Sequence, residues 1–357
     1  MKTLVAHLRN RSTQIISLLS IAAILSMASC GDDDSAPANQ PGAPACRLVR
    51  ETNTSTAQYG GNITYTYKSV FEYSYDDAGN IIGDTYRYNY VYSDGKTAAS
   101  TSTSSSQFNA EGYVIRAVRQ YNSINRDGVT NAETANEEYT YEKGRRTRYS
   151  VTRIVNGTET KYVIAYEYDA EGRIVKTTNT YDNSTIKIEY SGNTVSKLTR
   201  TDAAGNSSSP FLQYNSQGLL VKAIETYGGY TDEYRYTYTA DNLLEREERY
   251  INGERSSGSQ IEYDTKENPY ATVYAPLKGA PKIPGTRPGY VNTRNYTRYQ
   301  SLQPNADKTA FINGPSTIYV YDYNDKGFPT GYTSSSTDGN GAKTGTQTVT
   351  FEYSNCP

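Results

Sequence analysis

Aromatic and polar residues alternate along much of the chain. In residues 233–238, EYRYTY, the tyrosines would share one face of an extended segment and Glu, Arg and Thr the other. Residues 86–92, YRYNYVY, and 186–190, IKIEY, repeat the pattern. A period of two with one aromatic and one charged face is typical of an antiparallel strand buried on one side. We predict an all-β fold: a long antiparallel meander of about 16 to 20 strands, curved or rolled into a barrel-like sheet.

A turn motif separates these strands. An aromatic residue, Asp or Asn, two variable residues and Gly precede two or three β-forming residues, as in YDAEGRI at 168–174. Asp or Asn can accept a hydrogen bond from the backbone two residues on, and Gly can adopt the left-handed conformation of a bulged turn. Two-residue turns, such as NG at 156–157, GG at 228–229 and NG at 252–253, lie between the motifs. Copies begin at Tyr75, Phe108, Tyr168, Tyr214 and Tyr323, and weaker ones at Tyr141, Tyr190, Tyr238 and Tyr263.

The YDAEGRI unit resembles the YD repeat of RHS-type proteins, whose repeats coil a β-sheet into a shell. The large RHS shells use many more repeats and end in a toxin or protease module that we do not find in this chain, so we do not expect toxin delivery. The pattern as a whole also resembles Bacteroidetes surface lipoproteins of unknown function with a porin-like β fold. That resemblance implies a rolled antiparallel sheet and carries no activity or site residues.

A membrane-spanning barrel would also alternate polar and apolar residues. The second face of these strands is strongly charged, and the mean hydropathy of the chain is −0.74. Both features favour a sheet that does not cross the bilayer.

The N-terminus indicates export. Lys2, Arg9 and Arg11 precede an apolar run at 15–28, which is too short for a bilayer span of about 20 residues. Small residues then lead to Cys30, as in the lipobox of bacterial lipoproteins, which implies a signal peptide over 1–29 and a lipid on Cys30. An ordinary secretory signal is the alternative.

The segment after Cys30 indicates where the protein is anchored. The acidic run GDDDS at 31–35 resembles the surface-export signal of Bacteroidetes-type lipoproteins, and prolines follow to residue 45. We expect residues 30–45 to be a tether and the protein to be lipid-anchored in the outer membrane, exposed at the cell surface. The periplasmic face is the alternative.

Composition excludes some chemistry. The only histidine is His7, so after signal removal the chain cannot use a Ser-His-Asp or Cys-His arrangement, nor hold zinc through imidazole. The remaining 33 basic and 38 acidic residues leave a net charge of −5 without a basic stripe, so we do not expect nucleic acid as a partner. We expect no metal and no cofactor.

Two cysteines remain besides Cys30. Cys46 opens the predicted β domain, residues 46–357, and Cys356 is the penultimate residue. We predict a disulfide between them in an oxidising compartment, which would bring the first and last strands within about 7 Å. Two free thiols are the alternative.

One segment interrupts the repeats. Residues 276–315 hold six of the thirteen prolines, and we predict an irregular insertion there. Its basic and aromatic side chains suit an anionic glycan or a protein partner, although a loop that plugs or covers the sheet would have the same composition. The candidate ligand-binding residues are Arg287, Tyr290, Arg294, Tyr296, Arg298 and Tyr299.

We expect a binding or interaction module for a glycan or a protein. A carboxylate-dependent glycan hydrolase, with two carboxylates within about 10 Å, and a purely structural envelope protein are the alternatives. The 37 tyrosines, against six phenylalanines, would either form cross-strand ladders that hold the sheet or provide a platform of rings for sugars.

Overall fold

A computed structural model describes residues 46–58, 63–271, 273, 277–285, 287–288 and 293–354. The signal, Cys30 and the tether lie outside the described residues, as do Tyr290 and Cys356. All regular structure in the described part is β, and no helix there is long and apolar enough to cross a membrane. The all-β prediction is confirmed, with one strand more than the upper end of the predicted range.

The strands are β1 (Arg47–Gln58), β2 (Thr64–Tyr75), β3 (Ile81–Tyr92), β4 (Thr97–Phe108), β5 (Val114–Ile124), β6 (Thr130–Glu142), β7 (Arg145–Val155), β8 (Thr158–Tyr168), β9 (Ile174–Asn179), β10 (Ser184–Ser191), β11 (Thr194–Thr201), β12 (Ser207–Ser208), β13 (Phe211–Tyr214), β14 (Leu220–Tyr227), β15 (Tyr230–Tyr238), β16 (Leu244–Ile251), β17 (Glu254–Glu267), β18 (Arg294–Pro304), β19 (Phe311–Tyr323), β20 (Pro329–Thr337) and β21 (Lys343–Ser354).

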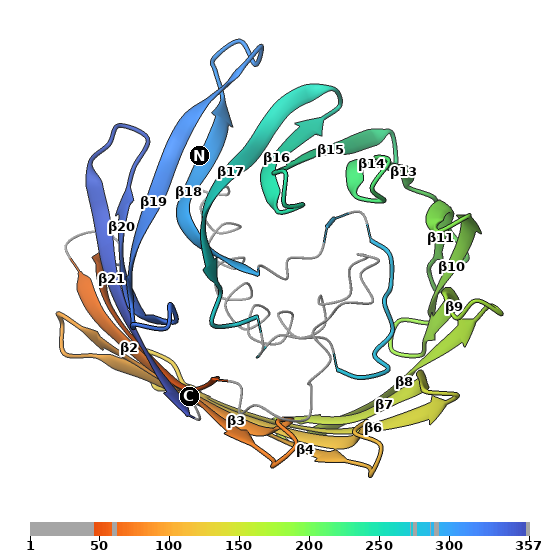
Figure 1. The fold of residues 1–357 in the computed structure, drawn as a ribbon, viewed down its shortest axis with the longest axis horizontal. Helices are drawn as coiled ribbons and strands as arrows, with labels where there is room; N and C mark the ends of the chain where they lie inside the picture. Colours follow the sequence, from red (N-terminus) through yellow and green to blue (C-terminus); the bar gives the residue numbers. More distant parts are fainter. Residues whose placement is uncertain are drawn as a thin grey trace.

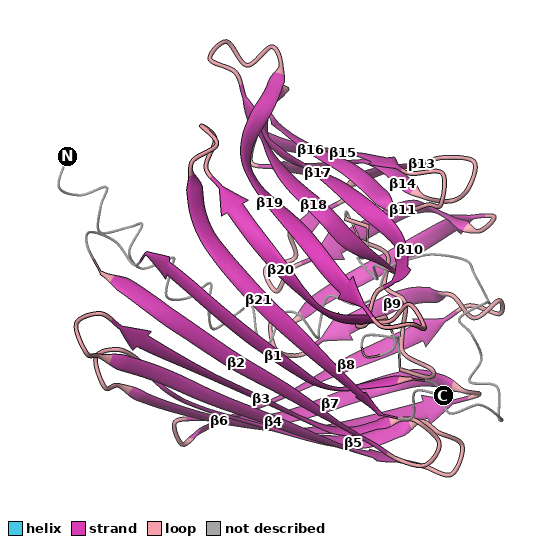
Figure 2. Ribbon diagram, turned by 60° about the vertical axis from the view of Figure 1, so that its left-hand side comes forward, coloured by secondary structure: helices cyan, strands magenta, loops and turns pink. Residues whose placement is uncertain are grey.

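The strands form one curled antiparallel sheet (Figure 1). Consecutive strands pair with each other everywhere except between β12 and β13, and β1 also pairs with β21 from Arg47↔Ser354 to Thr56↔Thr346. The strands run side by side and tilted around the curl (Figure 2). In such a meander alternate turns gather at opposite ends of the sheet. We call the end with the 76–80, 109–113 and 169–173 turns the base, and the opposite end the rim.

The ladder is interrupted at one place, which we call the seam. Short β12 pairs with β11 through Ser207 and Ser208, whereas β13 pairs with β14 from Phe211 onward. Between them, Pro210 has no N–H with which to continue a ladder. The chain therefore changes partner from one side to the other, and the curled sheet is not a closed barrel.

The turns follow the predicted chemistry. The Oδ1 atom of Asn109 accepts hydrogen bonds from the backbone N–H groups of Glu111 and Tyr113, at 3.1 and 2.9 Å, and Gly112 has a φ of +82°. At the rim, Asn156 and Gly157 have φ values of +48° and +85°, as a two-residue hairpin turn requires. The predicted hairpin turns are therefore present at these motifs.

In six hairpins a tyrosine at or near the end of the second strand bonds to the start of the first strand and so fastens the hairpin at the base. Tyr238, at the end of β15, donates its hydroxyl to the carbonyl of Leu220, the first residue of β14, at 2.7 Å. Phenylalanine could not make this bond, which explains part of the excess of tyrosine. The same contact joins Tyr75 to Leu48, Tyr168 to Arg146, Tyr190 to Ile174, Tyr263 to Leu244 and Tyr353 to Pro329.

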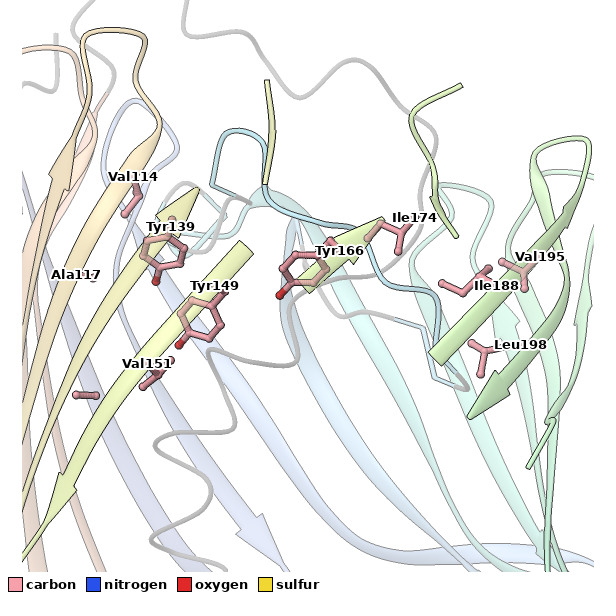
Figure 3. Close-up of a cluster of buried hydrophobic side chains, with 11 residues drawn as sticks. Val114, Ala117, Tyr139, Tyr149, Val151, Tyr166, Ile174, Ile188, Val195 and Leu198 are labelled. Atoms are coloured by element: carbon pink, nitrogen blue, oxygen red, sulfur yellow. The ribbon is translucent and has the colours of Figure 1, made fainter. Parts of the chain in front are cut away.

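Register assigns the tyrosines and the exposed charges to opposite faces. The concave face carries most tyrosines and three buried clusters, the largest of which includes Tyr139, Tyr149 and Tyr166 on neighbouring strands (Figure 3). The convex face carries ion pairs, such as Arg87–Glu72 at 2.5 Å and Lys176–Glu167 at 2.6 Å. Pairs of this kind contribute little to stability and indicate a surface in contact with water or a polar partner.

The irregular insertion is shorter than predicted. It spans 268–293, between the end of β17 and the start of β18, because β18 and the start of β19 occupy most of 294–315. Pro304 is the last residue of β18, and Pro315 lies where the β18–β19 register shifts. There the Gln300 side-chain amide donates to the Gly314 carbonyl at 2.7 Å. Prolines are tolerated at strand ends and bulges, so their number alone placed the boundary too late.

Candidate functional site

The described parts of the insertion lie inside the curl (Figure 1). Tyr270 and Val273 pack against the cluster around Leu48, and Ile283 packs against the largest cluster. The backbone N–H of Arg146 donates to the Gly279 carbonyl at 3.0 Å. The insertion therefore lies against several strands of the concave face near the base, as the plug alternative anticipated.

Arg287 and Arg294 are engaged within the protein. The Arg287 Nη2 donates to the Tyr234 hydroxyl at 2.9 Å, and its guanidinium carbon lies 4.8 Å from the centroid of that ring. The Arg294 Nη1 donates to the Thr265 carbonyl at 2.8 Å. Arg287 thus holds the insertion to β15, and Arg294, the first residue of β18, bonds to the end of β17.

Arg298, Tyr299 and Tyr296 do not form one surface. Arg298 and Tyr299 are consecutive in β18, so they point to opposite faces. Arg298 lies on the convex face, 3.7 Å from Glu262, whereas Tyr299 is 41% exposed on the concave face. Tyr296 packs against Tyr263 with ring centroids 5.3 Å apart. With Tyr290 outside the described residues, ligand binding by these six residues stays a prediction.

A larger aromatic surface lies on β2 and β3. Register places Tyr65 opposite Tyr92, Tyr67 opposite Tyr90 and Phe71 opposite Tyr86, all on the concave face. We call this surface the aromatic wall; it comprises Tyr65, Tyr67, Phe71, Tyr73, Tyr86, Tyr88, Tyr90 and Tyr92. The alternation at 86–92 indicated half of it, but the cross-strand register that completes it could not be predicted from the chain.

The rings of the wall form one connected network from rim to base. The centroids of Tyr65 and Tyr90 are 5.2 Å apart, those of Tyr67 and Tyr90 4.8 Å, and those of Phe71 and Tyr86 4.0 Å. Most of these rings are half-buried, so part of each remains accessible on the concave face. Aromatic pairs at such distances stabilise one another and hold the ring faces in place.

Burial keeps three phenols of the wall, those of Tyr86, Tyr88 and Tyr90, uncharged at neutral pH. The hydroxyls of Tyr67 and Tyr86 are 2.6 Å apart. Burial, followed by the bond to Tyr67, raises the pKa of Tyr86 well above its ordinary value of 10. Burial also raises the pKa of Tyr88 and Tyr90. These hydroxyls are therefore neutral groups that can both donate and accept hydrogen bonds.

Small polar residues flank the wall. On β4, Ser100 and Ser102 pair with Tyr88 and Tyr86, so they share the concave face. On the other side β1 presents Asn53, whose Oδ1 is buried and has no hydrogen-bond partner in the described part of the protein. A buried acceptor of this kind is usually satisfied by water or a ligand.

The concave carboxylates outside the wall are occupied by cations and phenols. Glu133 accepts two hydrogen bonds from Arg153, at 2.6 and 2.8 Å, and Asp232 pairs in the same way with Arg249. Hydrogen bonding to Arg249 lowers the pKa of Asp232. Carboxylates held in this state suit structural pairing better than proton donation to a leaving group.

Glu137 is the most enclosed of these carboxylates, only 4% exposed. It accepts from the Tyr149 hydroxyl at 3.0 Å and from the Tyr139 hydroxyl, and Arg119 lies 3.0 Å away. This network crosses β5, β6 and β7 within the largest buried cluster. In the part of the chain that the structure describes, no three His, Cys, Asp or Glu side chains gather as a metal site.

Cys46 lies at the base, directly before β1. It is 8% exposed and disulfide-bonded. Its predicted partner, Cys356, lies outside the described residues, so the Cys46–Cys356 pairing stays a prediction. The β1–β21 register begins at Arg47↔Ser354, so the residue that follows Cys46 lies opposite a residue two positions before Cys356.

Comparisons with known proteins gave matches among solved structures, two of which are porin-like proteins. No known protein family and no curated protein matches the chain. A porin-like protein from Bacteroides uniformis is 15% identical, with a TM-score of 0.34, over 86% of this chain and 97% of that one. A porin-like protein from Bacteroides vulgatus is 10% identical, with a TM-score of 0.25, over 86% and 98% of the two chains.

Proposed function

We propose that the protein is a glycan-binding module whose ligand lies along the aromatic wall. The observation that carries the proposal is the connected set of accessible ring faces on β2 and β3, bordered by hydroxyl and amide groups. The C–H face of a pyranose ring packs on such rings, while its hydroxyls need donors and acceptors at the border. The wall supplies both kinds of contact.

The proposal also includes the location of the protein in the cell. The lipobox at Cys30 and the acidic run behind it support a lipid anchor and exposure at the cell surface. The repeated turns and the fastened hairpins support a likeness to YD repeats at the level of the unit. Cys46, the first described residue, lies at the base, so the proposed tether would join the sheet at the end opposite the rim.

The test is a glycan-array screen of the purified protein, followed by titration calorimetry with each glycan that binds. Tyr67→Ala and Tyr88→Ala remove rings from the middle of the wall, and each is expected to weaken binding about tenfold. Phe211→Ala is the matched control, because Phe211 is an aromatic residue that is 55% exposed on the convex face.

The folded state of each variant is checked by its circular dichroism and its urea midpoint. Folded wall variants that bind as tightly as the parent would contradict the site, and an array with no bound glycan would contradict the function.

A further inference from the structure

Charge is unevenly distributed over the concave face. On the rim side of Ser69, the inward residues of β20, β21 and β1 to β4 are all uncharged in the described strands. They are tyrosines and small polar or apolar residues; examples beside the wall are Asn53, Ser55, Ser100, Ser334 and Gln347. Beyond β4 the same face continues with Ser123, which pairs with Ser100, and with Asn131, which pairs with Ser123.

The concave charges nearest to this region are occupied or covered. Asp84, opposite Tyr73 on the base side, accepts a hydrogen bond from the Ser104 hydroxyl. Glu51, nearer the base, is 7% exposed, and burial raises its pKa while a hydrogen bond from Tyr270 of the insertion opposes the rise. At the rim, Arg126 lies 5.1 Å from the Tyr92 ring centroid but is paired with Asp94. Two described cations of the insertion are engaged: Lys278 donates to the Glu111 carbonyl at 2.7 Å, and Arg287 donates to the Tyr234 hydroxyl. The exposed Lys282 precedes Ile283, which packs against the largest cluster and not against the wall.

We infer that the aromatic wall takes an uncharged glycan and discriminates against uronic-acid and sulfated chains. The inference rests on the proposed function and names its substrate class. An anionic sugar on the wall would lose hydration and meet no free cation in return, whereas a neutral sugar loses only hydroxyl hydration that the phenols, serines and amides replace. The expectation of an anionic ligand came from basic residues that the structure holds in internal contacts.

Matched pairs of glycans test the inference. The probes are oligogalacturonate and its fully methyl-esterified form, dextran sulfate and dextran, and the neutral and anionic members of the array, each at 50 and 500 mM NaCl. The neutral member of a pair is expected to bind at least about tenfold more tightly, with less than about a twofold change between the two salt concentrations. Tighter binding of anionic members that weakens in salt would overturn the inference and leave the proposed function standing; no binding by any member would overturn both.

Two lysine substitutions test whether an anionic glycan binds on the wall or is attracted by charge anywhere on the surface. Ser55→Lys puts a cation on the concave face beside the wall, and Thr54→Lys puts the same cation on the convex face one residue away. The Ser55 variant is expected to bind the anionic member of a pair several-fold more tightly than the parent does, and the Thr54 variant to bind it as the parent does. Equal gains from the two variants would show that charge acts from anywhere on the surface, which contradicts a ligand seated on the wall.

Discussion

Arg200 on β11 donates to Glu225 on β14 at 2.7 Å, across a chain segment that pairs with β11 at one end and with β14 at the other. The contact therefore bridges the seam, where backbone hydrogen bonds are fewest. Leu212 and Tyr214 of β13 add apolar contacts, because they pack against the buried clusters on both sides.

Removing this bridge is expected to loosen the seam. Arg200→Ala leaves Glu225, which is 14% exposed, without its cation, and we expect a loss of about 1–2 kcal/mol in the free energy of unfolding. Arg50→Ala is the control: its ion pairs on the convex face are 3.8 and 4.0 Å long and 40% or more exposed, so its loss is expected to be below about 0.5 kcal/mol. Urea unfolding measures both. Hydrogen exchange that speeds up evenly over the sheet, and not first in β11 and β14, would contradict the role of the bridge.

The hydrogen bond from the Tyr238 hydroxyl to the Leu220 carbonyl is expected to stabilise the hairpin of β14 and β15. Tyr238→Phe keeps the ring but leaves the Leu220 carbonyl without its hydroxyl donor, so we expect a loss of about 1–2 kcal/mol. Tyr181→Phe removes a hydroxyl from a residue that is 61% exposed and is expected to change stability by less than about 0.5 kcal/mol. Thermal or urea unfolding compares the two, and equal losses would mean that the fastening bond adds nothing.

These buried phenols also predict an alkaline transition. Burial raises the pKa of Tyr75 and Tyr168 to about 12, whereas in the unfolded chain they titrate near 10. A pKa raised by folding means that the unfolded state loses its protons first, so the stability contribution is complete below pH 10 and is lost as the pH rises toward 12.

We therefore expect a constant urea midpoint from pH 7 to 9 and a steep fall from pH 10 to 12. Absorbance of phenolate near 295 nm should lag behind that of the urea-unfolded chain over the same range. Coincident titration curves for the folded and unfolded protein would show that the phenols are not protected.

The sequence was most informative where local chemistry decides the outcome. Alternation gave the strands and their order, and Asp or Asn with Gly gave turns such as that at Asn109, because each depends on residues that are close in the chain. The aromatic wall depends on the register between β2 and β3, which a one-residue slip would reverse. The insertion was misjudged at its C-terminal boundary because proline marks both loops and strand bulges, and Pro315 belongs to the second kind.

The disulfide of Cys46 is predicted to link the first and last strands of the sheet. If its partner is Cys356, Cys46→Ser and Cys356→Ser should each lower the free energy of unfolding by about 2–4 kcal/mol, and the double variant by no more than either single one. Peptide mapping without reduction should recover one cross-linked peptide that contains both residues. Additive losses, or a cross-link from Cys46 to Cys30, would contradict the pairing.

The anchor prediction depends on a single sulfur atom. Cys30→Ala removes the thiol that would carry the acyl chains while it leaves the apolar signal intact, so the protein should lose fatty-acid labelling and move from the membrane fraction to the soluble fraction. Asp32→Ala, Asp33→Ala and Asp34→Ala together should keep the lipid and reduce the exposure of the protein to protease added to intact cells, because they remove only the acidic run. A Cys30→Ala protein that stays with membranes after high salt and carbonate washing would show that something other than a lipid on that cysteine holds it there.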